Sequence, residues 1–379
     1  MDDFFLDATK TAPNPCYILD ERKFIQNMET LSAVQKLSGA KILCAFKGFS
    51  MWSTFPIMKK HLAGATASSL NEVRLCFEEM GVKAHSCFVV YLEEEFETVL
   101  QMSSHVTFNS LNQYDTFKKY IKDHPEVSFA LRLNPKFSKV TTAKYNPCMP
   151  GSRFGISMED MPNNLPVGIT GLHFHSLCES DADELEQVLG IIESKIGNLL
   201  HQCNWVNMGG GHHLTRKDYN KDLLVTLLNN FKQKYSTEMF LEPGEAIGWE
   251  TGVLLSKVQD VVESDGVKTA ILNVSFSAHM PDCLEMPYKP RVVNEKPQGK
   301  SYVLGGNSCM SGDFVSGFHF ENELQVGDEV IFEDMMHYTF VKSSTFNGVA
   351  LPGIATVKTS GELIVQKEFS YSDFKSRLS

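Results

Sequence analysis

The chain has 379 residues, 42% of them hydrophobic and 21% charged, an ordinary globular composition that excludes disorder, collagen and low-complexity sequence. At about 150 residues per domain, this length predicts about two to three domains. The net charge of −11 argues against a basic nucleic-acid groove and is compatible with a cationic ligand.

The cysteines and the start of the chain indicate a reducing compartment. The nine cysteines are odd in number and include no C-x-x-C pair, which argues against a disulfide framework or a structural zinc site. The acidic opening MDDFFLDATK lacks the basic region of a signal peptide. A membrane helix needs about 18 consecutive apolar residues, and no run in this sequence approaches that length. We therefore expect a cytoplasmic protein without a membrane segment.

Short β-rich runs recur along the chain from residue 41, with amphipathic helical patterns between them. Strands are expected at 41–46, 64–68, 86–91, 105–109, 127–133, 169–175, 204–209 and 239–242. Eight strands that alternate with helices are typical of a parallel (β/α)8 barrel, and a doubly wound open sheet is the alternative. The even number of strands and the polar residues described below favour the barrel.

Three segments show helical periodicity clearly. The pattern at 69–81 places Leu70, Val73, Leu75 and Phe77 around an apolar stripe and ends at Gly81. The segment 180–196 begins with a helix-capping residue and an acidic first turn, and 218–235 repeats this arrangement.

After about residue 245 the pattern changes to strand-like runs without long helices between them. Turn signals at 265–266, 327–328 and 360–361 separate these runs. The sequence therefore predicts a C-terminal antiparallel β domain. We place the barrel at residues 14–245 and the β domain at 246–379, and leave open whether residues 1–13 join the β domain.

Polar residues follow the first and sixth expected strands. Lys47 comes directly after the first strand, at the C-terminal mouth where barrel active sites lie. A desolvated lysine there can lose its charge and attack an aldehyde, whereas a plain surface lysine is the alternative. His173 and His175 share one face of the sixth strand. Three interpretations are open: the pair forms a metal site of H-x-H type, one ring stacks on an aromatic cofactor, or both are core histidines.

The seventh and eighth expected strands end in further candidates. Gly209, Gly210 and Gly211 allow backbone N–H groups to approach an anion closely, although a tight turn is equally compatible. Glu242 ends the eighth strand and suits a protonated heteroaromatic nitrogen. Pyridoxal phosphate needs these chemical types together: an imine-forming amine, a stacking ring, phosphate donors and a partner for its pyridine nitrogen.

At these residues the sequence resembles the fold type III pyridoxal phosphate decarboxylases, which have an alanine racemase-like fold. It is most similar to the carboxynorspermidine/carboxyspermidine decarboxylase family. The matching segments, from about residue 13 to 350, include KILCAFKGFSMWSTFP, LHFHSLCESDAD, VNMGGGHHLTRKDY, LEPGEAIGW and GGNSCMSGD. The resemblance implies a barrel followed by a β domain. It also implies decarboxylation of carboxynorspermidine or carboxyspermidine to norspermidine or spermidine, pyridoxal 5′-phosphate as cofactor, and a homodimer with a shared active site.

The resemblance also implies roles for individual residues. Those expected around the cofactor are the imine-forming Lys47, the neighbouring Arg132, the stacking ring of His175, the phosphate loop Gly209, Gly210 and Gly211, the nitrogen partner Glu242, and Tyr338 on the phosphate. Cys309 resembles the cysteine general acid that is supplied across the dimer, and Asp313 would receive the distal amine of the substrate. Asp282 and Glu285 are further candidates for a cationic polyamine tail, with solvated surface acids as the alternative.

Two positions depart from the family pattern. Glu245, in EPGE, stands where many relatives have an arginine that binds phosphate or substrate. An acid cannot bind phosphate, so Glu245 either favours a cationic substrate or points away from it. Cys178 stands where the H-x-x-S pattern of relatives places a phosphate-binding serine.

Several other functions remain open at this point. A decarboxylase of diaminopimelate, ornithine or arginine would share the same residues. An amino-acid racemase usually has an arginine at the ring nitrogen, which Glu242 contradicts. A metal-dependent hydrolase would rest on the two histidines alone, and a non-catalytic binding protein would not need both Lys47 and Cys309. The sequence does not separate carboxynorspermidine from carboxyspermidine, whose difference of one methylene is worth about 1–3 kcal/mol.

Overall fold

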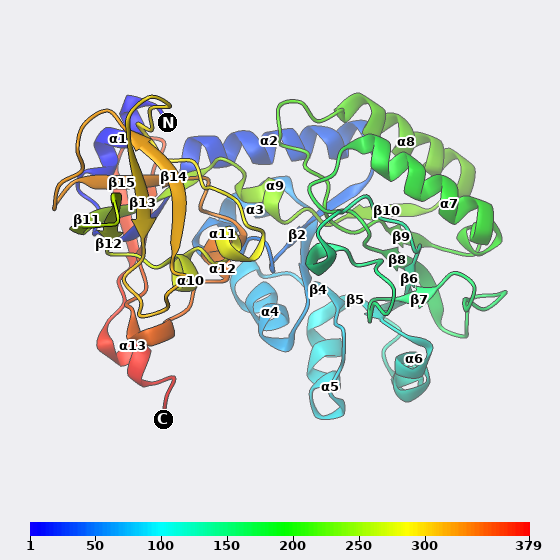
Figure 1. The fold of residues 1–379 in the computed structure, drawn as a ribbon. Coiled ribbons are helices and arrows are strands. Elements are labelled where there is room, and N and C mark those ends of the chain that lie inside the picture. The colour runs from blue at the N-terminus through cyan, green and yellow to red at the C-terminus, as the bar shows by residue number, and fades with distance from the viewer. The chain divides into compact units, whose positions relative to one another are not determined.

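The computed structural model describes residues 1–379 and divides the chain into two units, a barrel unit of residues 27–247 and a sheet unit of residues 1–26 and 248–379 (Figure 1). Residues 14–26, which we placed with the barrel, therefore belong to the sheet unit. The reason is that β1 (Cys16–Asp20) pairs with β11 (Gly252–Ser264) and β16 (Gly353–Val357) of that unit. Such long-range pairing leaves no signal in the local pattern of hydrophobic residues.

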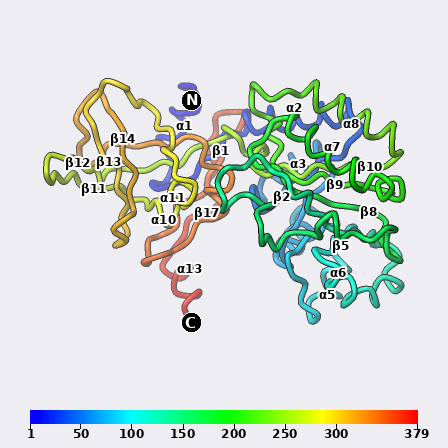
Figure 2. Tube along the Cα trace, turned by 45° about the vertical axis from the view of Figure 1, so that its right-hand side comes forward, coloured from blue at the N-terminus to red at the C-terminus, as the bar shows by residue number.

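Eight parallel strands form the barrel. They are, in spatial order, β2 (Lys41–Ala45), β3 (Gly64–Ala67), β4 (Ala84–Cys87), β5 (Ser103–Phe108), β6 (Ser128–Asn134), β8 (Ile169–Phe174), β9 (Trp205–Asn207) and β10 (Glu238–Leu241). The ring closes because β10 pairs with β2. Figure 2 labels β2, β5, β8, β9 and β10 of this ring on the chain trace. The predicted barrel is thus confirmed, and the open sheet is excluded.

Helices connect most of these strands. They are α3 (Phe55–His61), α4 (Leu70–Leu75), α5 (Glu93–Met102), α6 (Leu111–Phe117), α7 (Ala182–Leu200) and α8 (Lys221–Tyr235). In the chain, α2 (Glu21–Ser38) precedes β2, and α9 (Glu245–Gly248) follows β10. Shorter helical turns are η1 (Trp52–Thr54), η2 (Cys76–Met80), η3 (Lys118–Asp123) and η4 (Ala143–Tyr145). No long helix joins β6 to β8. Only η4 and the two-residue strand β7 (Ile156–Ser157), which pairs with β6, lie there.

The helical segment that begins at Leu70 differs from our prediction in its buried face. Val73, Cys76 and Met80 are buried, whereas Phe77 is 43% exposed. The buried residues follow the spacing i, i+3, i+7 of one helix face, and Phe77 falls beyond its edge. As we predicted, the segment ends at Gly81, and the φ of this residue is 67°.

The barrel interior is packed with side chains. One buried cluster consists of Leu43, Ala130, Trp205 and Phe240. A Cβ atom at Gly171 would clash with the Trp205 ring, so only glycine leaves room for the indole there.

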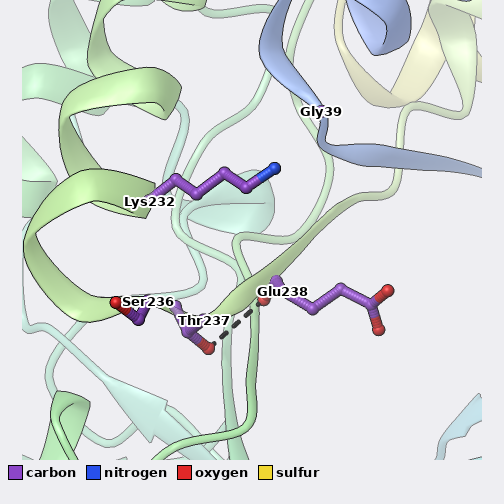
Figure 3. Close-up of a pocket in the computed structure, with 5 residues that line it drawn as sticks. All are labelled: Gly39, Lys232, Ser236, Thr237 and Glu238. Carbon is purple, nitrogen blue, oxygen red and sulfur yellow. Dashed lines mark hydrogen bonds between the residues drawn. The ribbon is translucent and has the colours of Figure 1, made fainter.

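A cavity of about 470 Å³ lies at the start of β10, and its lining residues are Gly39, Lys232, Ser236, Thr237 and Glu238 (Figure 3). Glu238 is the first residue of β10, so this cavity lies at the amino end of the strands. Active sites of such barrels lie at the opposite, carboxyl end. The catalytic residues are therefore expected at that end.

The sheet unit contains the strands of the other sheet. They are β1, β11, β12 (Val267–Leu272), β13 (Lys300–Gly305), β14 (Phe314–Phe320), β15 (Glu329–Glu333), β16 and β17 (Leu363–Lys367). Most neighbours are antiparallel, which confirms the predicted β domain, although β1 with β16 and β12 with β13 are parallel. Asp265 and Gly266 both have positive φ, as a two-residue turn between antiparallel strands requires.

The helices of the sheet unit are short. They are α1 (Asp3–Thr9), α10 (Phe276–His279), α11 (Pro281–Glu285), α12 (Tyr338–Val341), α13 (Tyr371–Lys375) and the turn η5 (Phe346–Gly348). Its core includes the buried side chains Phe5, Cys16, Ile18, Val253, Leu255, Ala355 and Val357. None of the helices in either unit is long and apolar enough to cross a membrane.

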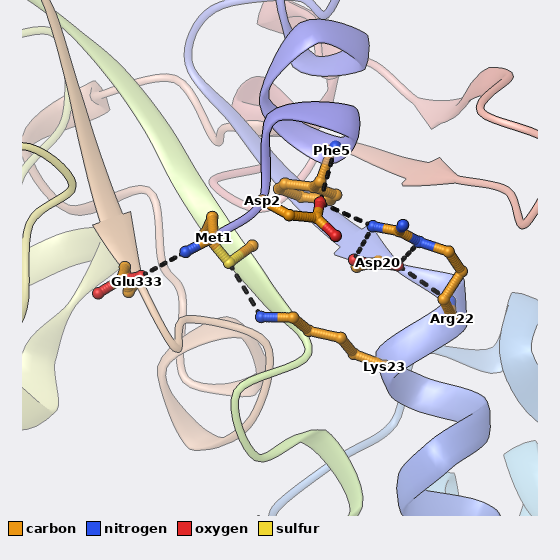
Figure 4. A network of polar contacts seen from close by, with 7 residues as sticks. All are labelled: Met1, Asp2, Phe5, Asp20, Arg22, Lys23 and Glu333. Atoms are coloured by element: carbon orange, nitrogen blue, oxygen red, sulfur yellow. Dashed lines mark hydrogen bonds and ion pairs between the residues drawn. The ribbon is translucent and has the colours of Figure 1, made fainter.

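Polar contacts tie the first residues of the chain to the sheet unit (Figure 4). The guanidinium of Arg22 lies 2.9 Å from a carboxylate oxygen of Asp2 and 2.9 Å from one of Asp20. Asp2 also caps α1 by accepting a 3.0 Å hydrogen bond from the Phe5 amide. Residues 1–13, whose place we left open, therefore lie in the sheet unit.

Candidate active site

The predicted residues of the barrel unit gather at the carboxyl ends of its strands. Lys47 follows β2, His175 follows β8, and Glu242 follows β10. The Nζ atom of Lys47 lies 3.4 Å from Nε2 of His175. The fold thus brings together an amine, a flat ring and a carboxylate that are far apart in the sequence.

The His175 ring is oriented by the backbone of the glycine loop. The Gly210 amide donates a 3.0 Å hydrogen bond to Nδ1 of His175. Burial lowers the pKa of His175 well below its usual value, with the charges of Lys47 and Arg132 adding to the effect. A neutral imidazole whose Nδ1 accepts carries its proton on Nε2, the atom that lies near Lys47.

The Lys47 ammonium is electrostatically disfavoured. Although the side chain is exposed, surrounding protein atoms desolvate it enough to lower its pKa, and the positive charge of Arg132 lowers the pKa further. The charge of Glu242 opposes these effects. A lysine nucleophile must be unprotonated, so this environment suits attack on an aldehyde.

Glu242 is a buried carboxylate, only 8% exposed. Burial raises its pKa, while hydrogen bonds from Asn207 and Thr66 act in the opposite direction. Nδ2 of Asn207 donates to Oε1 of Glu242 at 2.6 Å, and Nε2 of His173 lies 3.6 Å from Oε2. A carboxylate with a raised pKa and fixed orientation is suited to share a proton with a basic ring nitrogen.

The glycine loop packs closely against the segment that follows β8. Gly209 and Gly211 have φ values of 70° and 88°, and a Cβ atom on either would clash with backbone of that segment. The Gly209 amide donates to Oδ1 of Asn207 at 2.9 Å, and the Gly210 amide is used by His175. The Gly211 amide is engaged by no acceptor of the chain. It is therefore the loop amide left to bind an anion.

Arg132 lies inside the barrel on β6, where it is buried. Its guanidinium carbon lies 4.7 Å from the centre of the Phe154 ring. Arg132, His173 and Asn207 pair in register across β6, β8 and β9, so their side chains share the inner face at one level. His173, which we could not assign from the sequence, belongs to this buried polar layer.

Two further residues of the site were not predicted from the sequence, although each has a recognisable pattern around it. Asn207 stands two residues before Gly209, on the face of the strand that leads to the loop. Glu72 ends the S-x-x-E pattern of a helix start, and its carboxylate accepts a 2.6 Å hydrogen bond from the Ser68 amide. Burial raises the pKa of Glu72 and the charge of Lys47 lowers it, which places Glu72 in the same electrostatic cluster.

In the sheet unit, Cys309 lies in the loop between β13 and β14. Its side chain is exposed, and its amide donates a 2.7 Å hydrogen bond to Oδ1 of Asn347. Asp313, 5% exposed, accepts hydrogen bonds from the amides of Ser277 and Ser308 at 2.8 and 3.2 Å, and from the Ser308 hydroxyl at 2.6 Å. Asp313 therefore braces the loop that carries Cys309, in addition to any contact with substrate.

The other predicted acids have partners of their own. Nζ of Lys342 lies 2.6 Å from Oδ1 of Asp282 and also contacts the carboxylate of Glu285. In the barrel unit, Oε2 of Glu245 lies 3.9 Å from Nε2 of His213. Tyr338 is the first residue of α12. The substrate-binding roles of these residues, and the phosphate contact of Tyr338, stay predictions.

Comparison with known proteins identifies the family. Residues 16–336 match the family described as "Pyridoxal-dependent decarboxylase, C-terminal sheet domain". The chain belongs to the pyridoxal-dependent decarboxylases. This result confirms the expected cofactor class, which the barrel residues had indicated chemically.

Two related proteins and one solved structure match this decarboxylase over nearly its whole length. It is 44% identical over 370 residues to the carboxyaminopropylagmatine decarboxylase of Synechocystis sp., covering 97% of this chain and 95% of that protein. It is 40% identical over 377 residues to the carboxynorspermidine/carboxyspermidine decarboxylase of Campylobacter jejuni, covering 96% and 98%. The crystal structure of carboxynorspermidine decarboxylase from C. jejuni, complexed with norspermidine, has a TM-score of 0.88 at 39% identity and covers 96% and 99%. These matches confirm the resemblance found in the sequence.

The residues of the barrel unit fit pyridoxal phosphate. Lys47 has the lowered pKa of an imine-forming amine, and His175 offers a flat ring of fixed orientation. The Gly211 amide provides a backbone donor for an anion, and Glu242 provides a buried carboxylate. Each chemical requirement of this cofactor thus has a residue at the carboxyl end of the barrel.

Proposed function

We propose that this decarboxylase removes the α-carboxyl group of a carboxylated polyamine, carboxynorspermidine or carboxyspermidine, and yields norspermidine or spermidine. The observation that carries the proposal is the cluster of Lys47, His175 and Glu242 at the barrel mouth. The 40% identity with the C. jejuni enzyme over almost the entire chain supports the choice of substrate.

Carboxyaminopropylagmatine is a second candidate substrate, and the 44% identity with the Synechocystis enzyme favours it. Both kinds of substrate carry an amino-acid head and a cationic chain. They differ at the distal end, where the polyamine has an ammonium group and agmatine a guanidinium group. Lys47 and Glu242 would act on the amino-acid head, which both substrates share. Contacts with the distal end must therefore decide between the two substrates.

When bound, pyridoxal phosphate supplies an electron sink for the pair of electrons left on the α-carbon after CO₂ departs. Lys47 would hold the cofactor through its unprotonated amine. His175 would lie against the ring, and the Gly211 amide would bind the phosphate, assisted by Tyr338. Glu242 would hold the proton of the pyridine nitrogen, with Arg132 as a neighbouring positive charge.

Residues of the sheet unit would complete the reaction. Cys309 would donate the proton of its thiol to the α-carbon after CO₂ is lost. Asp313, Asp282 and Glu285 would receive the cationic tail, because ammonium groups pair favourably with carboxylates. Glu245, where relatives have arginine, would add negative charge at the barrel end.

We also propose a homodimer with a shared active site, located in the cytoplasm. The family membership supports the shared site, in which Cys309 serves the partner subunit. All nine cysteines are free, which suits a reducing compartment. Mixing Lys47→Ala and Cys309→Ala subunits tests the arrangement, since mixed dimers would contain one intact site. Activity should reappear on mixing, and its absence at full dimer exchange would contradict a shared site.

The substrate is tested by CO₂ release from a panel of amino acids. The panel contains carboxynorspermidine, carboxyspermidine, carboxyaminopropylagmatine, meso-diaminopimelate, ornithine and arginine, with Lys47→Ala as the inactive control. We expect the highest kcat/KM with a carboxylated polyamine. Preference for carboxyaminopropylagmatine would establish the second candidate, and activity only on diaminopimelate or ornithine would contradict both. Failure of borohydride to fix the cofactor on Lys47 would contradict the cofactor's attachment there.

A further inference from the structure

The Asn207 side chain connects two parts of the candidate site. Its Nδ2 donates a 2.6 Å hydrogen bond to Oε1 of Glu242, and its Oδ1 accepts a 2.9 Å hydrogen bond from the Gly209 amide. Asn207 is 2% exposed, so water does not compete for these contacts. Only one orientation of the amide satisfies both, because the oxygen must face the backbone donor and the NH₂ group the carboxylate.

The backbone adds a second connection between the same segments. The amide of Glu242 donates to the carbonyl of Gly209 at 2.7 Å. The segment after β10 and the first residue of the glycine loop are therefore held together by one main-chain hydrogen bond and one side-chain bridge. Such a doubly connected contact resists independent movement of the carboxylate and the loop.

We propose that Asn207 is a positioning residue that fixes the Glu242 carboxylate relative to the glycine loop. This inference rests on the proposed function only for the roles of those two groups in holding the cofactor. Asparagine suits the position because it presents a donor and an acceptor on one short side chain. Aspartate would set a second carboxylate against Glu242, and leucine would leave both the Gly209 amide and Glu242 without this partner.

The bridge also acts on the charge of Glu242. Burial disfavours the ionised carboxylate, and the hydrogen bond from Asn207 stabilises it. Removing that donor should therefore weaken the anionic form as well as the orientation of Glu242. A residue that served packing alone would have no such effect on proton binding.

The test compares Asn207→Asp, Glu242→Gln and the double variant as full-length proteins. Asn207→Asp keeps the acceptor for the Gly209 amide but replaces the donor with a second carboxylate. The double variant reverses the pair, because the amide at position 242 can donate to the carboxylate at position 207. Asn204→Asp is the matched control, since Asn204 is exposed near the start of the same strand. Titration with pyridoxal phosphate gives the Kd, and thermal unfolding gives Tm between about pH 5.5 and about pH 8.

We expect Asn207→Asp to raise the Kd for pyridoxal phosphate about 10-fold to 100-fold, as loss of one buried hydrogen bond to a charged group predicts. Its Tm relative to the parent protein should fall as pH rises. Two adjoining buried carboxylates share a proton, so one has its pKa raised above the unfolded value. Stability from that proton is present at low pH and is lost as pH rises through the raised pKa. The double variant should lose this pH dependence of Tm. Its catalytic turnover should stay slow, because it lacks the Glu242 carboxylate.

The proposal is overturned if Asn207→Asp leaves the Kd unchanged and its Tm difference does not vary with pH. It is also overturned if the double variant keeps the pH dependence of Asn207→Asp, or if Asn204→Asp shows the same dependence. Failure of the proposed function would look different. In that case the parent protein itself would not bind pyridoxal phosphate, while the Tm measurements would still report the contact between Asn207 and Glu242.

Discussion

The two nitrogens of Lys47 and His175 that lie 3.4 Å apart restrict each other's protonation. The other ring nitrogen of His175 is already an acceptor for the Gly210 amide, so the neutral ring directs its N–H toward Lys47. A hydrogen bond between the two then requires a lone pair on Nζ, which only the unprotonated amine has. The lowered pKa of Lys47, caused first by desolvation and next by Arg132, agrees with this state.

Two substitutions of His175 should separate the role of its ring from that of Nδ1. Phenylalanine keeps a flat ring but leaves the Gly210 amide without its acceptor, at a cost of about 1–3 kcal/mol in unfolding free energy. Asparagine removes the ring, yet its side-chain oxygen lies close to the position of Nδ1 and can accept from Gly210. We expect urea unfolding to show the loss of stability for His175→Phe and little loss for His175→Asn. Equal destabilisation by both would contradict the role assigned to Nδ1.

Lys47→Arg should abolish covalent attachment of the cofactor while keeping a positive charge. A guanidinium stays protonated in proteins and cannot attack an aldehyde. We expect no borohydride-fixed cofactor by mass spectrometry, and a decrease in kcat of at least about 100-fold. Lys257→Arg on β11 of the sheet unit is the control, because it makes the same lysine-to-arginine change outside the candidate site. Retention of a reducible adduct by Lys47→Arg would show that another amine holds the cofactor.

Much of the barrel could be predicted because its information is local. Each strand is a short buried run, and parallel strands in a barrel direct their carboxyl ends to one side, which places Lys47, His175 and Glu242 together without knowledge of distant contacts. The sequence could not reveal that β1 joins the other unit, since that depends on pairing with β11 and β16 far along the chain.

The hydrogen-bond partners of the site residues could not be predicted from the sequence either. The sequence offered both Asp313 and Asp282 to a cationic tail, Asp313 through the resemblance and Asp282 as a further candidate. In the structure Asp282 pairs with Lys342, and Asp313 accepts three hydrogen bonds from its own loop and from Ser277. The identity of a residue shows which bonds it can make, whereas its partners depend on how the loops fold. Asn207 is intermediate: we did not predict it, although alternation along the strand could have placed it near the loop, and its link to Glu242 leaves no signal in the sequence.

Asp313→Asn tests whether Asp313 contacts the substrate. The substitution removes the negative charge and places an NH₂ group among donors that previously had an acceptor, so we expect unfolding free energy to fall by about 1–3 kcal/mol. We also expect KM for the cationic substrate to rise, because a carboxylate partner for the distal amine is lost. Steady-state kinetics give the answer. A fall in kcat at unchanged KM would mean that Asp313 acts only by bracing the Cys309 loop.

Lys342→Met should strengthen substrate binding if Asp282 and Glu285 receive the cationic tail. The Lys342 ammonium contacts both carboxylates and so competes with an incoming cation. Without it, we expect KM for the carboxylated polyamine to fall, with kcat little changed. Lys342→Arg keeps the competing charge and is the matched control. An unchanged or higher KM for Lys342→Met would indicate that the tail binds elsewhere.

His85 and His105 should make the barrel sensitive to acid independently of catalysis. Their rings stack with centroids 3.8 Å apart, near Trp205 and Phe240 in the barrel interior. Burial lowers the pKa of His105 to about 4 and that of His85 well below its usual value. Because the folded pKa values lie below the unfolded value of about 6.5, the unfolded chain binds more protons as pH falls, and stability is lost between about pH 6.5 and about pH 4.

Replacing these histidines with phenylalanine should therefore flatten the acid limb of the stability profile. For His105, whose folded pKa is about 4, the difference from the unfolded value costs about 2 kcal/mol at about pH 5 relative to about pH 7. The lowered pKa of His85 adds to this loss in the same direction. Urea unfolding of the His85→Phe and His105→Phe variants at both pH values measures this difference, and His201→Gln at an exposed position is the control. Activity near neutral pH should persist, since the pair lies on β4 and β5 below the strand ends that carry Lys47 and Glu242. An acid limb as steep as that of the parent protein would show that other groups cause the loss of stability.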